Sequence, residues 1–285
     1  IGNNFNLNAG LGRAASFIDE GTTNVTNTTN IQYYCETDHW HYISACFNPG
    51  TNNFIQLFSF PLPTSFYRWD ESYNDQGIVG WWIDILYSNE WNVTTFLPGH
   101  GYAITDYTPK GSTFTLSGNL YNSTKSVTLT KTQNSTAEGW NLVGNPFPCS
   151  MAANTAADGT NNFISRNTSL LDDTWGGIYF FDESINDYVT VSNGSTEAYI
   201  SSGQGFMVMT KQNGNSISFH VDDRKHGAAN FYKDGDQNSR TYLTLNGPDD
   251  QMNPAEIVFL EGMTKELDPG FDAGKFKGND EISLY

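Results

Sequence analysis

Two acidic turns carry the side chains best suited to hold a metal ion. They contain Asp70, Glu71 and Asp75 in one turn and Asp182, Glu183 and Asp187 in the other. Clustered carboxylate oxygens on a loop are ligands that Ca²⁺ prefers. The same residues also suit hairpin turns, where solvated carboxylates bond nearby backbone groups. The turn is the favoured interpretation, Ca²⁺ is the alternative, and no other cofactor is indicated.

The patterns that would support catalysis are missing or incomplete. The segment from Asp234 begins like an EF-hand loop, but its twelfth position is Leu245 instead of a bidentate Glu. No Gly-x-Ser-x-Gly nucleophile motif occurs. His39 and His41 could lie on one face of a strand and bind a metal with a third ligand. Ordinary polar surface is the favoured interpretation, because the second repeat has Gly139 and Asn141 at these positions. Two carboxylates could perform glycosidase chemistry, but a chain with 31 acidic residues offers such pairs by chance. The sequence predicts a protein that is not an enzyme.

The three cysteines indicate a disulfide instead of a thiolate metal site. Cys35, Cys46 and Cys149 form no Cys-x-x-Cys pair. One disulfide with one free thiol is the simplest arrangement outside the cell. Three pairings are compatible with the sequence, and all three stay open.

Seven Asn-x-Ser/Thr sequons could accept a glycan where the host has the machinery. They lie at Asn24, Asn27, Asn92, Asn122, Asn134, Asn167 and Asn193. An Asn- and Thr-rich chain produces many sequons by chance, so they are candidates only.

The adjacent Trp81 and Trp82 are candidates for an aromatic contact surface. On a strand the two rings point to opposite faces, so one of them meets solvent or a partner. Exposed rings stack on sugars and also dock subunits.

Composition and charge exclude several classes of partner. Charged residues make up 16 % of the 285-residue chain, and the net charge is −17. Phosphate-binding surfaces need clusters of Lys and Arg, and the few basic residues here are scattered. No apolar run reaches the roughly 20 residues of a membrane-spanning helix. We therefore expect neither nucleic acid as a partner nor a transmembrane segment.

A duplication dominates the organisation of the chain. Five blocks recur in the same order, and their matched residues are Trp40 and Trp140, Gly50 and Gly159, Asp70 and Asp182, Gly101 and Gly205, and Ser112 and Ser216. The blocks are short, aromatic and β-branched, and they are separated by turn residues. Phe114 and Leu116 alternate with polar residues, as in a half-buried strand. The Gly-x-Gly pairs indicate a bulge or the tight start of a strand. These patterns predict an all-β fold of tandem β-sandwich-like units with antiparallel strands and few or no helices.

The repeats divide the chain into four parts. Residues 1–38 are expected to form an N-terminal β segment and a Thr/Asn-rich turn, residues 39–138 the first repeat, and residues 139–225 the second. Residues 226–285 are expected to form the start of a further β domain or a terminal strand segment. Strands are expected at Thr241–Leu245 and Glu256–Leu260. The strand-like run at Ile282–Tyr285 has no cap after it, so either the polypeptide continues or this run pairs with another chain.

Several of these segments resemble a known group of exported proteins. The Trp-His-Tyr-Ile-Ser block from Trp40, the run from Gly139 to Pro148 and the segment from Phe271 to Phe276 are similar to large secreted Bacteroidetes proteins. The resemblance implies export by the type IX secretion system and a multidomain, β-rich, adhesin-like or surface-layer protein. The C-terminal sorting domain of that group is missing from this sequence. The group brings no catalytic residues with it.

Taken together, these features predict an extracellular or cell-surface structural or adhesive protein. Its partners would be further copies of itself, joined by β-strand addition into a filament or surface layer. The alternative is a carbohydrate-binding module that contacts extracellular glycans. Residues that differ between the repeats, such as Trp81 and Trp82, are the expected place for any specific role.

Overall fold

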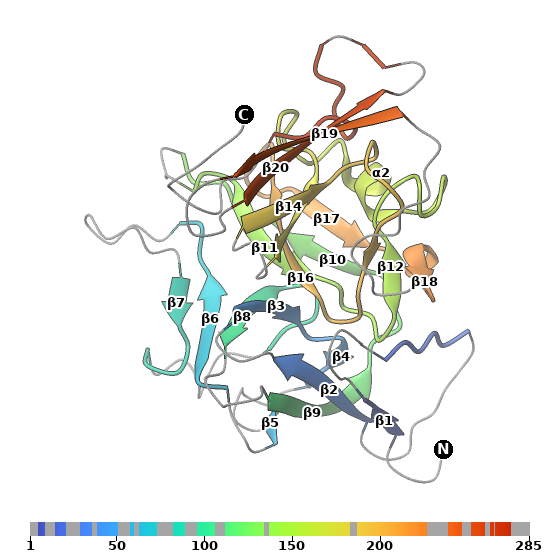
Figure 1. The fold of residues 1–285 in the computed structure, drawn as a ribbon. Helices are drawn as coiled ribbons and strands as arrows, with labels where there is room; N and C mark the ends of the chain where they lie inside the picture. The colour runs from blue at the N-terminus through green and yellow to red at the C-terminus, as the bar shows by residue number, and fades with distance from the viewer. Residues whose placement is uncertain are drawn as a thin grey trace.

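A computed structural model gives the fold of the chain (Figure 1). The residues it describes are 5–8, 15–20, 29–35, 39–50, 58–59, 63–72, 82–88, 96–105, 112–133, 137–182, 187–226, 239–246, 252–259, 263–264 and 266–274. Every structural statement below concerns these residues.

The all-β fold expected from the sequence is confirmed. The described strands form small sheets that are antiparallel except for the pairing of β1 with β2. Helix is confined, in these residues, to the five-residue α2 (Phe163–Asn167) and the 3₁₀ turn η2 (Val221–Asp223). No described helix is long and apolar enough to cross a membrane.

The first unit, residues 29–120 together with the edge strand β1, consists of two sheets. One has the strand order β3 (His41–Ser44), β8 (Gly101–Thr105), β6 (Ser65–Trp69) and β7 (Trp82–Asp84). The other has the order β1 (Phe5–Leu7), β2 (Thr29–Cys35), β9 (Ser112–Leu120) and β4 (Phe47–Asn48), with β5 (Phe58–Ser59) also paired to β9.

Alternating side chains build the core of this unit. On β9, Phe114 and Leu116 are fully buried, as their alternation with polar residues predicts. On β2, every second side chain from Thr29 to Cys35 is buried in the same way. Phe114, Leu116 and the buried apolar side chains of β2 pack with Phe66 and Ile104 of the four-stranded sheet into one apolar cluster.

The second unit, residues 125–225, repeats this plan with additions. Its four-stranded sheet has the order β11 (Trp140–Gly144), β16 (Gly205–Met209), β13 (Ile178–Asp182) and β14 (Asp187–Val191). β10 (Lys125–Thr128) pairs with β17 (Ser216–Phe219), and a third sheet has the order β15 (Tyr199–Ile200), β12 (Ser150–Ala152) and β18 (Arg224–Lys225).

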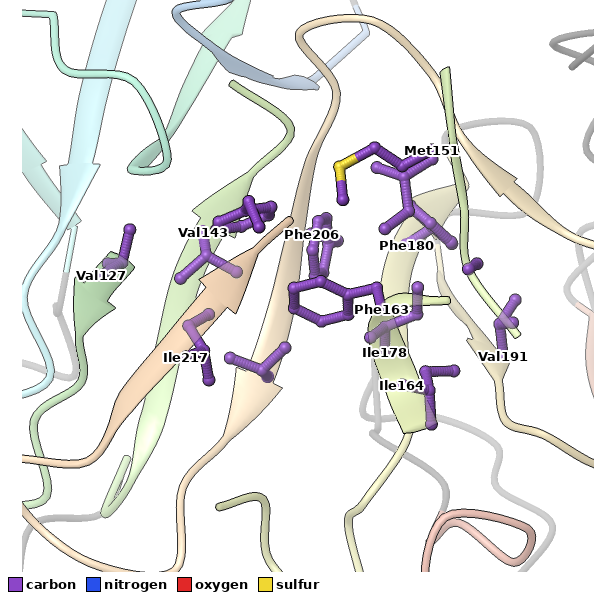
Figure 2. Close-up of a cluster of buried hydrophobic side chains, with 14 of the residues drawn as sticks. Val127, Val143, Met151, Phe163, Ile164, Ile178, Phe180, Val191, Phe206 and Ile217 are labelled. Carbon is purple, nitrogen blue, oxygen red and sulfur yellow. The ribbon is translucent and has the colours of Figure 1, made fainter. Parts of the chain in front are cut away.

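The core of the second unit lies between these sheets and α2 (Figure 2). Phe163 of α2 meets the rings of Phe206 and Phe219 at centroid distances of 5.2 and 5.1 Å. The helix begins at the repeated Gly-Thr-Asn-Asn-Phe-Ile block, where the Asn162 side chain accepts a hydrogen bond from Ser165 N. The first copy of this block lies mostly outside the described residues.

The two four-stranded sheets share strand order and register. Tyr67 pairs with Ala103 in the first unit, and Tyr179 pairs with Met207 at the matched position of the second. Trp40 packs edge-on against Tyr67, and Trp140 packs edge-on against Tyr179. The repeated blocks therefore occupy equivalent places in two copies of one sheet.

The boundaries of the two units, as strand pairing defines them, differ from those expected from the sequence repeats. β10 falls inside the expected first repeat, but it pairs with β17 of the second unit over four residues. β2 falls inside the expected N-terminal segment, but it pairs with β9 over seven residues. In each unit the strand that precedes the repeated Trp therefore belongs to that unit, because it pairs with a strand near the end of the same unit, β2 with β9 and β10 with β17.

Segments from both sides of the repeats pack onto the units. Residues 15–19 lie against both units: Ala15 and Phe17 pack on the apolar cluster of the first unit, and Phe17 N donates to Pro148 O of the second at 2.6 Å. Residues 266–274 also bind the second unit, through Tyr179 Oη to Gly274 O at 2.7 Å and Asn193 N to Gly270 O at 2.7 Å. β19 (Ser239–Asn246) and β20 (Met252–Phe259) form a hairpin at the two expected strand positions.

Candidate functional site: the seam between the two units

The two units meet through reciprocal backbone contacts. Ser44 N donates to Gly203 O at 2.7 Å, and Gly144 N donates to Gly99 O at 3.1 Å. Ser44 and Gly144 hold the same position in their repeats, and so do Gly203 and Gly99. The contact is therefore close to twofold symmetric. In each unit the last residue of β3 or β11 donates its backbone N–H to the first glycine of the other unit's Gly-x-Gly pair.

The Gly-x-Gly pairs make this approach sterically possible. Gly99 and Gly203 have φ of 86° and 64°, a conformation that favours glycine. A Cβ on Gly101 would lie 2.5 Å from Leu142 Cγ, and one on Gly205 would lie 2.9 Å from the backbone of Tyr42. Gly101 and Gly205 do begin strands, as the sequence indicated. The seam is the additional reason for these glycines, because it brings the partner unit's side chains and backbone against them.

Aromatic and apolar side chains from the facing sheets fill the seam. This central aromatic cluster consists of Trp140, Leu142, Tyr179, Tyr188 and Met207, with Tyr42, Trp69, Trp82, Trp175, Phe181 and Met209 half-buried around them. The Tyr42 ring is the link between the units, since it stacks on Phe181 at 5.6 Å and contacts Trp82 at 5.6 Å.

Two polar contacts fix the orientation of these rings. Tyr42 and Tyr188 share a hydrogen bond of 2.6 Å between their hydroxyls. Trp69 Nε1 donates to Trp140 O at 2.7 Å. Burial raises the pKa of Tyr188 to about 12 and raises that of Tyr42 well above its ordinary value. Both phenols are therefore neutral hydrogen-bonding groups at physiological pH.

The acidic turn of the first unit is part of the seam. Glu71 is 2 % exposed. Its carboxylate accepts hydrogen bonds from Thr132 N, from Thr132 Oγ1 at 2.9 Å and from Gly139 N at 3.1 Å. The repeat pattern marked this turn, but the sequence could not show that its Glu reaches across to the second unit.

The remaining described calcium candidates do not converge on a metal site. Asp70 accepts hydrogen bonds from Ser72 and pairs with Arg68 at 2.9 Å, and these contacts lower the pKa of Asp70 against the effect of its partial burial. Asp182 and Asp187 pair in the hairpin of β13 and β14. In the described part of the chain, no three His, Cys, Asp or Glu side chains are grouped to hold a metal. Asp75 and Glu183 lie outside it.

No disulfide joins the three buried cysteines, so the expected disulfide is not formed. Cys35 and Cys46 lie in the apolar cluster of the first unit, and Cys149 lies in that of the second. The Cys46 thiol contacts Tyr33 Oη at 3.2 Å. Burial raises the pKa of Cys149 to about 12 and raises that of Cys46 as well. Their packing is that of small apolar side chains.

Three of the seven sequons can be placed. Asn122 is exposed in the link between the units. Asn167 and Asn193 are buried, and their side-chain amides bond within the fold: Asn167 Nδ2 to Ser218 O at 3.0 Å and Asn193 Nδ2 to Ser165 Oγ at 3.2 Å. A glycan on either would break these contacts, so both fail as acceptors in the folded protein. The other four, Asn24, Asn27, Asn92 and Asn134, lie outside the described residues.

The two tryptophans proposed as a contact surface have different outcomes. Trp82 lies in the central aromatic cluster, 5.0 Å from the ring of Trp69. Trp81 lies outside the described residues. His39 and His41 flank Trp40 at the start of β3, and among the described residues neither belongs to a group of three or more His, Cys, Asp or Glu side chains that could hold a metal.

Comparison with known proteins places this architecture in a family. Residues 4–285 match the family model described as a domain of unknown function, DUF8693. The chain belongs to the DUF8693 family. The match to DUF8693 spans both units and the segments that pack on them, so the family domain includes the whole seam. No curated protein and no solved structure matched the chain.

Proposed function

We propose that the chain is a structural or adhesive protein of the cell surface or the extracellular space, without enzymatic activity. One observation carries this proposal: Glu71 of the acidic turn and the aromatic side chains around Tyr42 serve to join the two repeats. Glu71 bonds Thr132 and Gly139, and the ring of Trp82 contacts the rings of Trp69 and Tyr42. Two repeats joined in this way would form one rigid block, which suits a protein that holds other domains or binding surfaces away from the cell.

The composition and the resemblance to exported Bacteroidetes proteins support a location outside the cell. The chain is rich in Asn, Thr and Ser, and its net charge of −17 favours solubility. In this proposal the main partner is a second copy of the chain.

Microscopy of the purified chain tests self-assembly. We expect negative-stain images at increasing concentration, with and without Ca²⁺, to contain oligomers or filaments. Size-exclusion chromatography with light scattering measures the same association in solution. Monodisperse monomers under every condition would contradict the proposal.

The second candidate function is carbohydrate binding, and it has one observation in its favour. Tyr87 is 83 % exposed, and it follows β7 on a turn that Asp84 fixes. Asp84 Oδ1 accepts hydrogen bonds from Leu86 N at 2.9 Å and Tyr87 N at 3.2 Å. A ring held out on an ordered turn can stack on a sugar.

Affinity electrophoresis against a panel of polysaccharides tests this alternative. A carbohydrate-binding role predicts retardation that is lost in Tyr87→Ala and kept in Leu97→Ala. Leu97 is a matched control because it is also an exposed apolar side chain, at 41 %. Unchanged mobility of the parent chain with every polysaccharide removes the alternative.

A further inference from the structure

The rings of Trp40 and Tyr67 form an edge-on pair on the first four-stranded sheet, with centroids 5.4 Å apart. The register places Tyr67 in one row with Ala103 and Tyr42, and register partners present their side chains on the same face. Tyr42 is part of the central aromatic cluster, while Trp40 and Tyr67 are half-buried on the same face. The aromatic face of this sheet therefore extends past the seam.

The matching pair in the second unit, Trp140 and Tyr179, is covered by a later part of the chain. Trp140 and Tyr179 are 8 % and 0 % exposed. Tyr179 Oη donates to Gly274 O at 2.7 Å, and a Cβ on Gly274 would lie 2.8 Å from the ring of Trp175. In the second unit, this place in the repeat thus holds a chain that crosses the aromatic pair.

The first unit is shaped differently along the path of that segment. Gly177 admits the segment in the second unit, because a Cβ there would lie only 3.0 Å from Ala273 Cβ. Ser65 holds the matching position in the first unit, on the same face of β6 as Tyr67. Its side chain occupies space that the peptide needs, and it adds a hydroxyl beside the rings. Aromatic rings with a neighbouring hydroxyl suit a sugar better than this peptide.

Tyr87 adds a third ring at the edge of the same sheet. The register places Trp40, Thr105 and Ser65 in one row across β3, β8 and β6. β7 is the next strand and the edge of the sheet (Figure 1), and Tyr87 follows its end with 83 % exposure. Three strand spacings of about 4.8 Å separate β3 from β7, or roughly 14 Å in all. Such a span suits a chain of several sugars better than a single sugar.

We infer that Trp40, Tyr67 and Tyr87 form a binding surface for a neutral polysaccharide. This inference rests on the carbohydrate-binding candidate above, and it names the surface and the class of ligand. Sugar rings stack on aromatic faces, and the Ser65 hydroxyl can both donate to and accept from a sugar hydroxyl. The net charge of −17 opposes the approach of an acidic polysaccharide.

Isothermal titration calorimetry of the full chain tests this surface. The probes are hexasaccharides of a β-glucan, a xylan and a mannan, with an oligogalacturonate as the acidic counterpart. Trp40→Ala removes one ring, and Ser65→Arg places a long side chain between the rings without removing any. Ser123→Arg is the matched control, because it adds the same charge at an exposed position in the link between the units. Circular dichroism reports folding, and Ser65→Arg decides the test if Trp40→Ala does not fold.

We expect at least one neutral hexasaccharide to bind, with affinity about tenfold weaker in Trp40→Ala and in Ser65→Arg and unchanged in Ser123→Arg. Binding that is lost in Tyr87→Ala but unchanged in Ser65→Arg would overturn the inference and leave carbohydrate binding in place elsewhere. A parent chain that binds none of the sugars would remove both. Equal affinity for the oligogalacturonate would contradict the neutral ligand. A synthetic peptide of residues 266–274 is titrated in the same way, and its binding in place of the sugars would show that the surface takes peptide.

Discussion

Glu71 shows how the fold uses a charged side chain at a single position. Its carboxylate is almost fully buried, and described hydrogen-bond donors from the second unit meet both of its oxygens. A buried carboxylate is tolerated only when its oxygens are bonded. This residue therefore positions the link around Thr132 against the first unit.

Replacing this carboxylate with an amide should weaken the seam. In Glu71→Gln one oxygen becomes an NH₂ group that faces donors, so at least one hydrogen bond is lost. We expect the free energy of unfolding to fall by about 1–3 kcal/mol. Urea denaturation measures it. Glu138→Gln is the matched control, because the Glu138 side chain is more exposed and its ion pair with Lys131 is long, at 3.8 Å. Equal stability of the two variants would contradict the role of Glu71.

His100 gives the seam a dependence on pH. It lies between Gly99 and Gly101, and its backbone forms an isolated antiparallel β-bridge with Val143 of the second unit. Burial, and secondarily the charge of Lys125, lowers the pKa of His100 below its ordinary 6.5. The imidazole of His100 therefore binds a proton less well in the folded state than in the unfolded state. Its contribution to stability is present above about pH 6.5 and falls as the pH decreases below that value.

His100→Gln tests this dependence, because Gln204 occupies the matched position in the second unit. We expect the variant to lose less stability than the parent chain between pH 7 and pH 5, measured by urea denaturation. His226→Gln is the control, since His226 is exposed. If His226→Gln flattens the profile as much as His100→Gln, the assignment is wrong.

At the scale of elements, the start of a strand is also a docking surface. β16 begins at Gly205, directly against the backbone of β3 in the other unit. Gly205→Ala should force the two apart and reduce stability by about 1–3 kcal/mol. Gly159→Ala is the matched control, because no atom lies within 4 Å of its added Cβ. Thermal unfolding followed by circular dichroism measures both, and a Gly205→Ala chain as stable as Gly159→Ala would contradict the docking role.

At the scale of the molecule, the central aromatic cluster joins two cores into one cooperative structure. Each unit has its own apolar cluster, and Tyr42 connects them through Phe181 and Tyr188. We expect one calorimetric transition for the parent chain, because neither unit can unfold without exposing the shared cluster.

Tyr42→Ala should separate the two transitions. It removes the ring that both units contact, at a cost of about 3 kcal/mol, and leaves each unit's own cluster in place. Differential scanning calorimetry would then resolve two components. Tyr87→Ala should keep the single transition, because Tyr87 is mostly exposed. A single, uniformly shifted transition for Tyr42→Ala would show that the coupling runs through other contacts.

The sequence by itself determined the fold class, the duplication and several strands. Phe114 and Leu116 are buried on β9 as their alternation predicts. The strands expected near Thr241 and Glu256 are present as β19 and β20. These features follow from local periodicity and from residue types that suit strands and turns. Such signals lie within a few neighbouring residues, so a single sequence contains them.

Only the tertiary structure decided what the marked residues contact. Glu71 meets Thr132 across 61 positions of sequence, and Trp69 meets Trp140 across 71. The burial of Asn167 and the separate burial of the three thiols depend on contacts of the same non-local kind. Composition and spacing contain no direct trace of such pairings, because they arise only when separate strands are brought together. For this reason the repeated turns and glycines were visible in the sequence, while the seam they form was not.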